Sequence, residues 1–69
     1  MTELTLTLNG ETRRFAGART LSELLAELDL DPRAVVVELN RRIVRRPELA
    51  ETKLANGDSV ELVHFVGGG

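Results

Sequence analysis

The chain is short, with 69 residues and a formal net charge of −2, and 42% of its residues are hydrophobic and 29% charged. This composition is typical of a folded globular domain and unlike that of a disordered chain. It contains no cysteine, which excludes disulfides, thiolate metal sites and a thiol nucleophile. We expect one domain of modest stability, because a chain of this size buries only about 60% of its unfolded surface.

The sequence also limits where the protein works. No apolar run approaches the roughly 18 residues of a membrane-spanning helix. The opening MTELTLTLNG lacks the basic and apolar regions of a signal peptide. The net charge gives no general attraction to nucleic acid. We therefore expect a cytoplasmic protein with no membrane partner and no nucleic-acid partner.

The first 15 residues predict a β-hairpin. The segment LTLTL, residues 4–8, alternates leucine with threonine, which indicates a strand with one buried face. Asn9-Gly10 favours a type I′ turn, since both central residues of that turn need positive φ. We expect residues 11–15 to return antiparallel, with Phe15 pointing inward.

A helix is predicted after the hairpin. Thr20 followed by Glu23 fits a capping box, and leucines then recur at positions 21, 24, 25 and 28 on one helical face. We expect about ten residues of helix. Pro32 follows shortly after this pattern and is consistent with a helix end.

Three more strands are predicted in the second half. The β-branched run AVVVEL, residues 34–39, is typical of a strand buried on both faces, and we place it at the centre of the sheet. A short strand follows at residues 43–44, and Pro47 opens an irregular or single-turn segment that extends through Thr52. After a turn at residues 56–58, SVELVHFV forms the final strand.

These elements predict an α+β fold, a ubiquitin-like β-grasp. Its order is ββαββ with a last strand that runs out of the fold, and the mixed sheet carries one main helix. The β-grasp domain takes residues 1–66, and residues 67–69 form a flexible glycine tail. We find no internal repeat and no linker.

The glycine tail is the most unusual feature of the chain. By itself it fits a frayed end or a cloning remnant. It directly follows a strand, however, and three extended residues reach about 10 Å beyond the domain. Glycine residues also fit into a narrow channel where a Cβ would clash, so the carboxylate of Gly69 could enter another protein's active site. The sequence has no phosphate loop, metal cluster or nucleophile–base pair to activate that carboxylate, so a separate enzyme must do so.

Three segments, LNGE, VVVELNRRIVRRPEL and LANGDSVELVHFVGGG, resemble the ThiS family, the sulfur carriers of thiamine biosynthesis. The resemblance covers nearly the whole chain, and the closing GDSVELVHFVGGG is its most specific part. It implies that the chain is not an enzyme but a protein substrate, with Gly69 as the residue that is adenylated and converted to a thiocarboxylate. Gly68 would be its required neighbour and Gly67 an extra flexible joint.

The resemblance also implies partners. A ubiquitin-activating-like adenylyltransferase of the ThiF type would consume ATP to activate the terminus, and the carrier itself would bind no cofactor. A cysteine desulfurase or rhodanese-like protein would donate the sulfur. Thiazole synthase of the ThiG type would receive it. We expect the carrier alone to be a monomer.

The residues leave other functions open. A related carrier would serve molybdopterin synthesis or another thiocarboxylate pathway. A ubiquitin-like modifier would transfer its terminus to lysines of other proteins. A β-grasp binding module would use its surface and have no need of its last residue. Deleting Gly69 would separate this last class from the others.

Apolar residues are predicted beside the tail. Alternation along the final strand places Val63 and Phe65 on the face opposite core-facing Leu62. We interpret Val63, Phe65 and Val66 as residues for partner docking. The alternative is that strand twist, a bulge or the segment 47–52 covers them.

Two further features receive structural interpretations. His64 falls on the core-facing side of the last strand, and without a second ligand or nucleophile we expect a partly buried structural histidine. Four arginines gather at positions 41, 42, 45 and 46, which we interpret as a solvated turn and edge, with docking to an acidic partner as the alternative. An aromatic content of 3% argues against single-stranded RNA binding.

Overall fold

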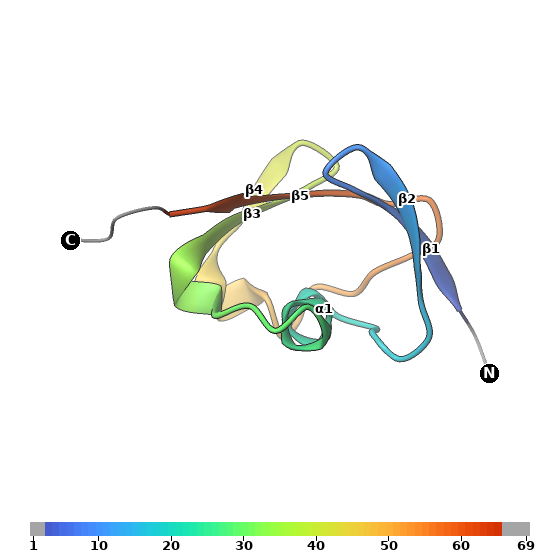
Figure 1. The fold of residues 1–69 in the computed structure, drawn as a ribbon. Coiled ribbons are helices and arrows are strands. Elements are labelled where there is room, and N and C mark those ends of the chain that lie inside the picture. The colour runs from blue at the N-terminus through green and yellow to red at the C-terminus, as the bar shows by residue number, and fades with distance from the viewer. Residues whose placement is uncertain (1–2, 66–69) are drawn as a thin grey trace.

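The computed structural model describes residues 3–65 and shows a five-stranded sheet with one helix on one face (Figure 1). In chain order the elements are β1 (Leu4–Leu8), β2 (Glu11–Phe15), α1 (Leu21–Glu27), η1 (Pro32–Ala34), β3 (Val35–Leu39), β4 (Arg42–Val44), η2 (Arg46–Glu48) and β5 (Ser59–His64), where η marks a 3-10 helix. The strand order is β2-β1-β5-β3-β4. Strands β1 and β5 are parallel and the other neighbours antiparallel. This arrangement confirms the predicted β-grasp.

The opening hairpin forms as predicted. Asn9 and Gly10 have φ values of 49° and 84°, the left-handed conformations that a type I′ turn requires. The strands pair in register, with Leu4 opposite Phe15. Phe15 is only 4% exposed and belongs to the core, as the alternation predicted.

Helix α1 begins with the predicted capping box. The Oγ1 of Thr20 accepts a hydrogen bond from the backbone N–H of Glu23 at 3.2 Å, and Oε1 of Glu23 accepts one from the N–H of Thr20 at 3.1 Å. These two bonds satisfy backbone donors that have no partner inside the helix. The sequence pattern therefore located the helix start correctly.

The helix is shorter than predicted, with seven residues instead of about ten. It ends in a Schellman motif, in which the N–H of Leu30 donates to the carbonyl of Leu25 at 2.9 Å and the N–H of Asp29 to that of Ala26 at 3.1 Å. Asp29 adopts φ 60° at the position where glycine is usual. Because the left-handed residue is an aspartate, no glycine in the sequence marks this end.

The prediction that β3 lies at the sheet centre with both faces buried is wrong. β5 is the central strand, and β3 lies between β5 and β4. Val35 and Val37 are buried, whereas Val36 and Glu38 are half-buried. The helix covers one face of the sheet only, so the opposite face lies open to solvent (Figure 1).

The segment after η2 closes the core beside the helix. The N–H of Leu21 donates to the carbonyl of Thr52 at 3.1 Å, and that of Ser22 to the carbonyl of Leu49 at 3.2 Å. This confirms the irregular, single-turn segment predicted around Pro47. The buried core consists of Leu6, Leu8, Phe15, Ala18, Leu21, Leu24, Leu25, Val35, Val37, Leu49, Leu54 and Val60. Within residues 3–65, no helix has the length and apolar character needed to cross a membrane.

Candidate functional site at the end of β5

Strand β5 leads from the centre of the sheet to the C-terminal segment. At its start it pairs with β1 on one side, Val60 lies opposite both Leu8 and Leu39, and the Val60 side chain is fully buried. β1 pairs with β5 only as far as Val60, whereas β3 pairs with it as far as His64. In the described part of the chain, the second half of β5 therefore pairs with one neighbouring strand instead of two.

Asn9 marks the point where β1 stops supporting β5. Its backbone N–H donates to the carbonyl of Val60 at 2.9 Å, and its side-chain Oδ1 accepts from the N–H of Leu62 at 2.8 Å. The sequence pattern indicates only a turn position for Asn9. The contact with Leu62 spans 53 residues of sequence, and no local pattern signals it.

Val63 and Phe65 are exposed, as the alternation predicted. Their exposed fractions are 56% and 58%, and Val63 lies opposite half-buried Val36 of β3. The alternative that segment 47–52 covers them is wrong, because that segment hydrogen-bonds to the start of α1 on the other side of the sheet. The third predicted docking residue, Val66, lies outside the described residues, as do Gly67, Gly68 and Gly69.

Two carboxylates lie next to these apolar side chains on the open face. Glu61 of β5 lies directly opposite Glu38 of β3, and neither has an ion-pair partner among residues 3–65. Like charges directly opposite each other across strands are mildly destabilising. The open face is therefore apolar at Val63, near the end of β5, and acidic at the next pair on the same face, Glu61 and Glu38.

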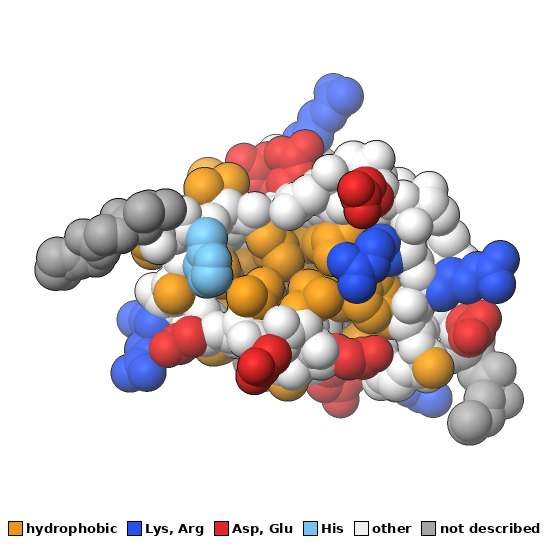
Figure 2. Space-filling model, viewed as in Figure 1, with side chains coloured by type: hydrophobic (Ala, Val, Ile, Leu, Met, Phe, Trp, Pro, Cys, Tyr) orange, Lys and Arg blue, Asp and Glu red, His pale blue; other side chains and the backbone are white. Residues whose placement is uncertain are grey.

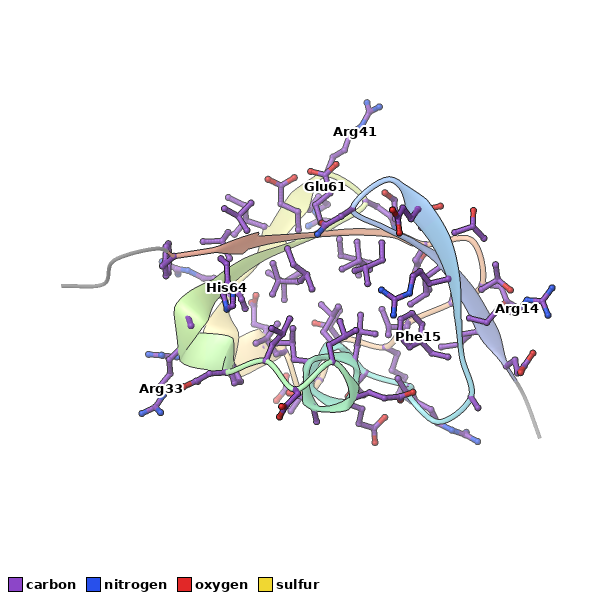
Figure 3. All side chains as sticks on the ribbon, in the orientation of Figure 1. Arg14, Phe15, Arg33, Arg41, Glu61 and His64 are labelled. Atoms are coloured by element: carbon purple, nitrogen blue, oxygen red, sulfur yellow. The ribbon has the colours of Figure 1, made fainter. Side chains whose placement is uncertain are left out.

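The prediction that His64 is partly buried is wrong, although its side of the strand was predicted correctly. The side chain lies on the helix side of the sheet (Figure 3) but is exposed. Helix α1 ends at Glu27, and a hollow lined by Leu28, Leu30 and other residues remains below this end of the sheet. The helical layer is too short to cover His64.

The short helix η1 holds the last described residue. The N–H of Phe65 donates to the carbonyl of Ala34 at 2.9 Å. At the start of η1 a salt bridge of 3.0 Å joins Arg33 to the N-cap residue Asp31, whose Oδ1 also accepts from the backbone N–H of Arg33. The side-chain hydrogen bond from Arg33 lowers the pKa of Asp31. An exposed ion pair thus caps the turn to which Phe65 is attached.

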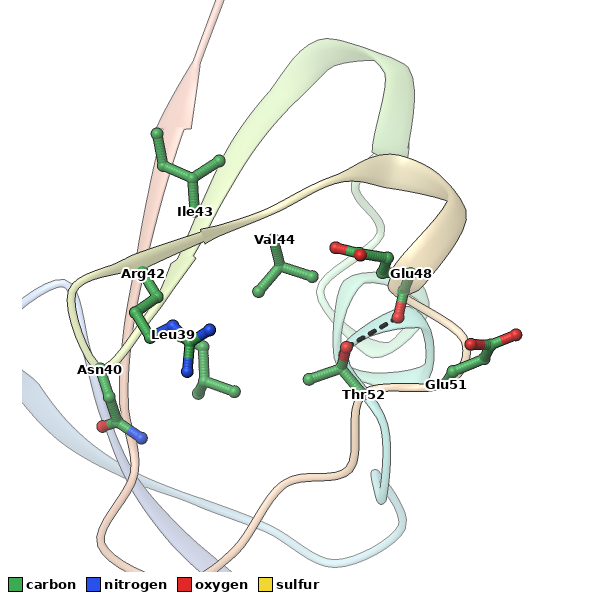
Figure 4. A pocket seen from close by; sticks show the side chains of 8 residues that line it. All are labelled: Leu39, Asn40, Arg42, Ile43, Val44, Glu48, Glu51 and Thr52. Carbon is green, nitrogen blue, oxygen red and sulfur yellow. Dashed lines mark hydrogen bonds between the residues drawn. The ribbon is translucent and has the colours of Figure 1, made fainter.

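The four arginines are exposed, as predicted for a solvated turn and edge. Arg41 extends away from the body of the protein at the β3–β4 turn (Figure 3). Arg42 lines a hollow of about 490 Å³ that Glu48 and Glu51 also line (Figure 4). Because Glu48 and Glu51 line the same hollow as Arg42, the segment with the four arginines does not present a uniformly basic surface.

Comparisons with known proteins agree with this geometry. A model of the ThiS family matches residues 6–69. The sulfur carrier protein ThiS of Bacillus subtilis is 38% identical over 65 residues, which cover 93% of this chain and 98% of that protein. The crystal structure of the thiamine biosynthesis protein (ThiS) from Geobacter metallireducens has a TM-score of 0.80 and 36% identity, and the match covers 96% of this chain and all of that one.

A second kind of relative is much longer. A thiazole synthase of Paramagnetospirillum magneticum is 44% identical over 64 residues, which cover 93% of this chain. A thiazole synthase of Magnetococcus marinus is 40% identical over 62 residues. The chain spans only about a fifth of the length of these two relatives, 20% and 19%. Each thus contains one segment that resembles nearly all of this chain.

Proposed function

Since this chain belongs to the ThiS family and is a sulfur carrier protein of thiamine biosynthesis, we propose that it holds the sulfur as a thiocarboxylate at Gly69. The observation that carries this proposal is the course of β5. That strand extends from the buried centre of the sheet past the end of β1, and the exposed Phe65 follows it directly. A domain anchored in this way can present its terminus to another protein while its core stays folded.

The proposed chemistry takes place in three steps. A carboxylate oxygen of Gly69 attacks the α-phosphorus of ATP, which releases pyrophosphate and leaves an acyl-adenylate. The outer sulfur of a persulfide on the donor then attacks the acyl carbon and AMP leaves, and a thiol reduces the resulting acyl disulfide, which releases the thiocarboxylate and leaves a disulfide between that thiol and the donor. Activation is needed because a free carboxylate repels nucleophiles and has no good leaving group. We assign the adenylation to a separate adenylyltransferase of the ThiF type, and the sulfur to a cysteine desulfurase or rhodanese-like donor.

We further propose a thiazole synthase as the protein that receives the sulfur. Two relatives named thiazole synthase contain a segment that resembles this chain. A carrier and its recipient that act in sequence would gain from being joined in one polypeptide, because the link raises their effective concentration.

Val63 and Phe65, together with Val66, are the proposed docking residues. Ordering a glycine tail costs roughly 1–2 kcal/mol per residue, so a partner that orders it must offset that cost by contacts with the folded domain. Val63 and Phe65 supply exposed apolar area close to the tail. Burial of such area upon binding is the main source of favourable free energy in most protein associations.

Intact-protein mass spectrometry tests the proposed site. The chain is incubated with ATP, an adenylyltransferase and a sulfur donor that are already verified on another carrier. We expect its mass to rise by the difference between one sulfur and one oxygen atom, with the change confined to the C-terminal peptide. A variant with one extra residue after Gly69 serves as the control and should keep its original mass. The site assignment fails if the native chain also stays unmodified while the verified carrier is converted.

A further inference from the structure

Among residues 3–65, no strand pairs with one backbone edge of the second half of β5. The N–H of Phe65 donates to Ala34, so odd-numbered residues of β5 direct their backbone groups toward β3. The carbonyl of Val60 and the N–H of Leu62 point the other way, toward Asn9. By the period of two along a strand, the carbonyl of Leu62 and the N–H of His64 lie on that same edge. Beyond Asn9, residues 3–65 provide no strand to pair with them.

An apolar hollow lies beside this edge. Its volume is about 310 Å³, and Asn9, Leu62 and His64 line it together with Leu28, Leu30, Val35 and Leu8. Figure 2 shows hydrophobic side chains gathered at this opening, with the single histidine at one side of them. An open strand edge and an apolar surface thus occur at the same place.

We propose that this edge of β5 is a β-augmentation site for an extended segment of the adenylating enzyme. The segment would lie in line with β1, beyond Asn9, and hydrogen-bond to the carbonyl of Leu62 and the N–H of His64. An added strand is the partner that fits, because an extended backbone presents donors and acceptors at the spacing of a neighbouring strand. This inference rests on the proposed function, since it names how the loading enzyme holds its substrate.

The hollow specifies the chemistry of that segment. Side chains of an added strand point alternately to the two faces of the sheet. One of them would therefore point toward the hollow, where Leu28, Leu30 and Val35 favour an aliphatic side chain. The opposite face would continue the surface of Val63 and Phe65. The same strand addition would thereby extend the sheet support of β5 toward the tail.

The site exists because β1 stops early. Its pairing with β5 ends at Leu8 and Val60, and the side chain of Asn9 takes the next position. A longer β1 would cover the edge and close the hollow. Such short open edges limit pairing between copies of the same chain. Stable pairing at this edge would therefore depend on additional contacts, which the hollow and the docking residues supply.

Amide hydrogen exchange of the native chain tests this proposal directly. In the free protein the amide of His64 should exchange quickly and that of Val63, which faces β3, slowly. Bound to the purified adenylating enzyme, the His64 amide should slow by about tenfold or more, as expected for a newly formed buried hydrogen bond. If its exchange rate is unchanged in a complex that still loads sulfur, the augmentation site is refuted and the carrier function stands. Failure of loading itself would count against the carrier site at Gly69 instead.

A pair of variants separates the backbone from the side chain. His64→Pro removes the N–H at the open edge without removing a bond to β3, whereas His64→Ala keeps that N–H. We expect the proline variant to weaken binding to the adenylating enzyme by about tenfold or more and the alanine variant by less than about twofold. Equal weakening in both would identify a side-chain contact and overturn the proposal. The exchange measurement uses the native chain, so it decides the question even if the proline variant does not fold.

Discussion

Val60 and Val63 are the same residue type on the same strand, yet their surroundings differ completely. Val60 is fully buried where β5 pairs with both β1 and β3, and Val63 is 56% exposed where, within residues 3–65, β5 pairs with β3 alone. The comparison shows how one strand can serve two purposes. Its first half holds the sheet together, and its second half presents surface and backbone to a partner. Mutations can perturb each half of β5 separately.

The largest effect is expected from truncating the buried valine. Val60→Ala should lower the free energy of unfolding by about 2–3 kcal/mol, because it removes two buried carbons and leaves a cavity. The matched change Val63→Ala should lower it by less than about 0.5 kcal/mol. Urea denaturation of both variants measures the difference. Equal losses would show that the two halves of β5 contribute alike to stability.

The next effect concerns binding instead of folding. Phe65→Ser should weaken the complex with the adenylating enzyme by about tenfold, equivalent to about 1.4 kcal/mol, because it removes exposed apolar area beside the tail. Its unfolding free energy should change little. Ile43→Ser is the control, since Ile43 is also exposed, at 67%, but lies on edge strand β4. Calorimetric titration with the adenylating enzyme measures the affinity of both variants. If Phe65→Ser unfolds the domain, Phe65 is a core residue and no docking residue.

A smaller effect is expected in the hairpin that supports β5 through β3. Asn40 and Arg41 have φ values of 52° and 72°, and the left-handed conformation strains an arginine. Arg41→Gly should therefore raise the unfolding free energy by about 0.5–1 kcal/mol. Arg42→Gly, one residue later in β4, should lower it by a similar amount, since glycine weakens a strand. Destabilisation by both changes would show that the turn carries no strain.

The smallest effect concerns the ion pair of η1, next to the exposed half of β5. Arg33→Ala should return the pKa of Asp31 toward its ordinary value, because the hydrogen bond from Arg33 is the main cause of the lowering. A lowered folded-state pKa gives a stabilising contribution that is present above the unfolded pKa and is lost as the pH falls through the folded pKa. Both groups are exposed, so the change in stability should be slight. An NMR titration of the Asp31 carboxyl that gives the same pKa in both proteins would contradict this prediction.

The sequence by itself determined the first turn, the start of the helix and the faces of the strands, which depend on neighbouring residues. The alternation in residues 4–8 and the Asn9-Gly10 turn produced the first hairpin, and Thr20 with Glu23 set the start of α1. The pattern of the last strand also assigned Val63 and Phe65 to the face where the structure places them. These signals are local because turn conformations, caps and the period of two act over only a few residues.

The tertiary structure alone decided the order of the strands in the sheet and how much of the sheet the helical layer covers. Alternation placed His64 on the helix side, but its exposure followed from the end of α1 at Glu27. The valine-rich run of β3 resembled a central strand, yet β5 took that position and left one face of the sheet open. Asn9 reached Leu62 across 53 residues only because folding brought the first turn beside the last strand. Such outcomes depend on packing between distant segments. The face of the sheet on which a residue lies, which the sequence pattern gives, therefore does not by itself predict whether the residue is buried.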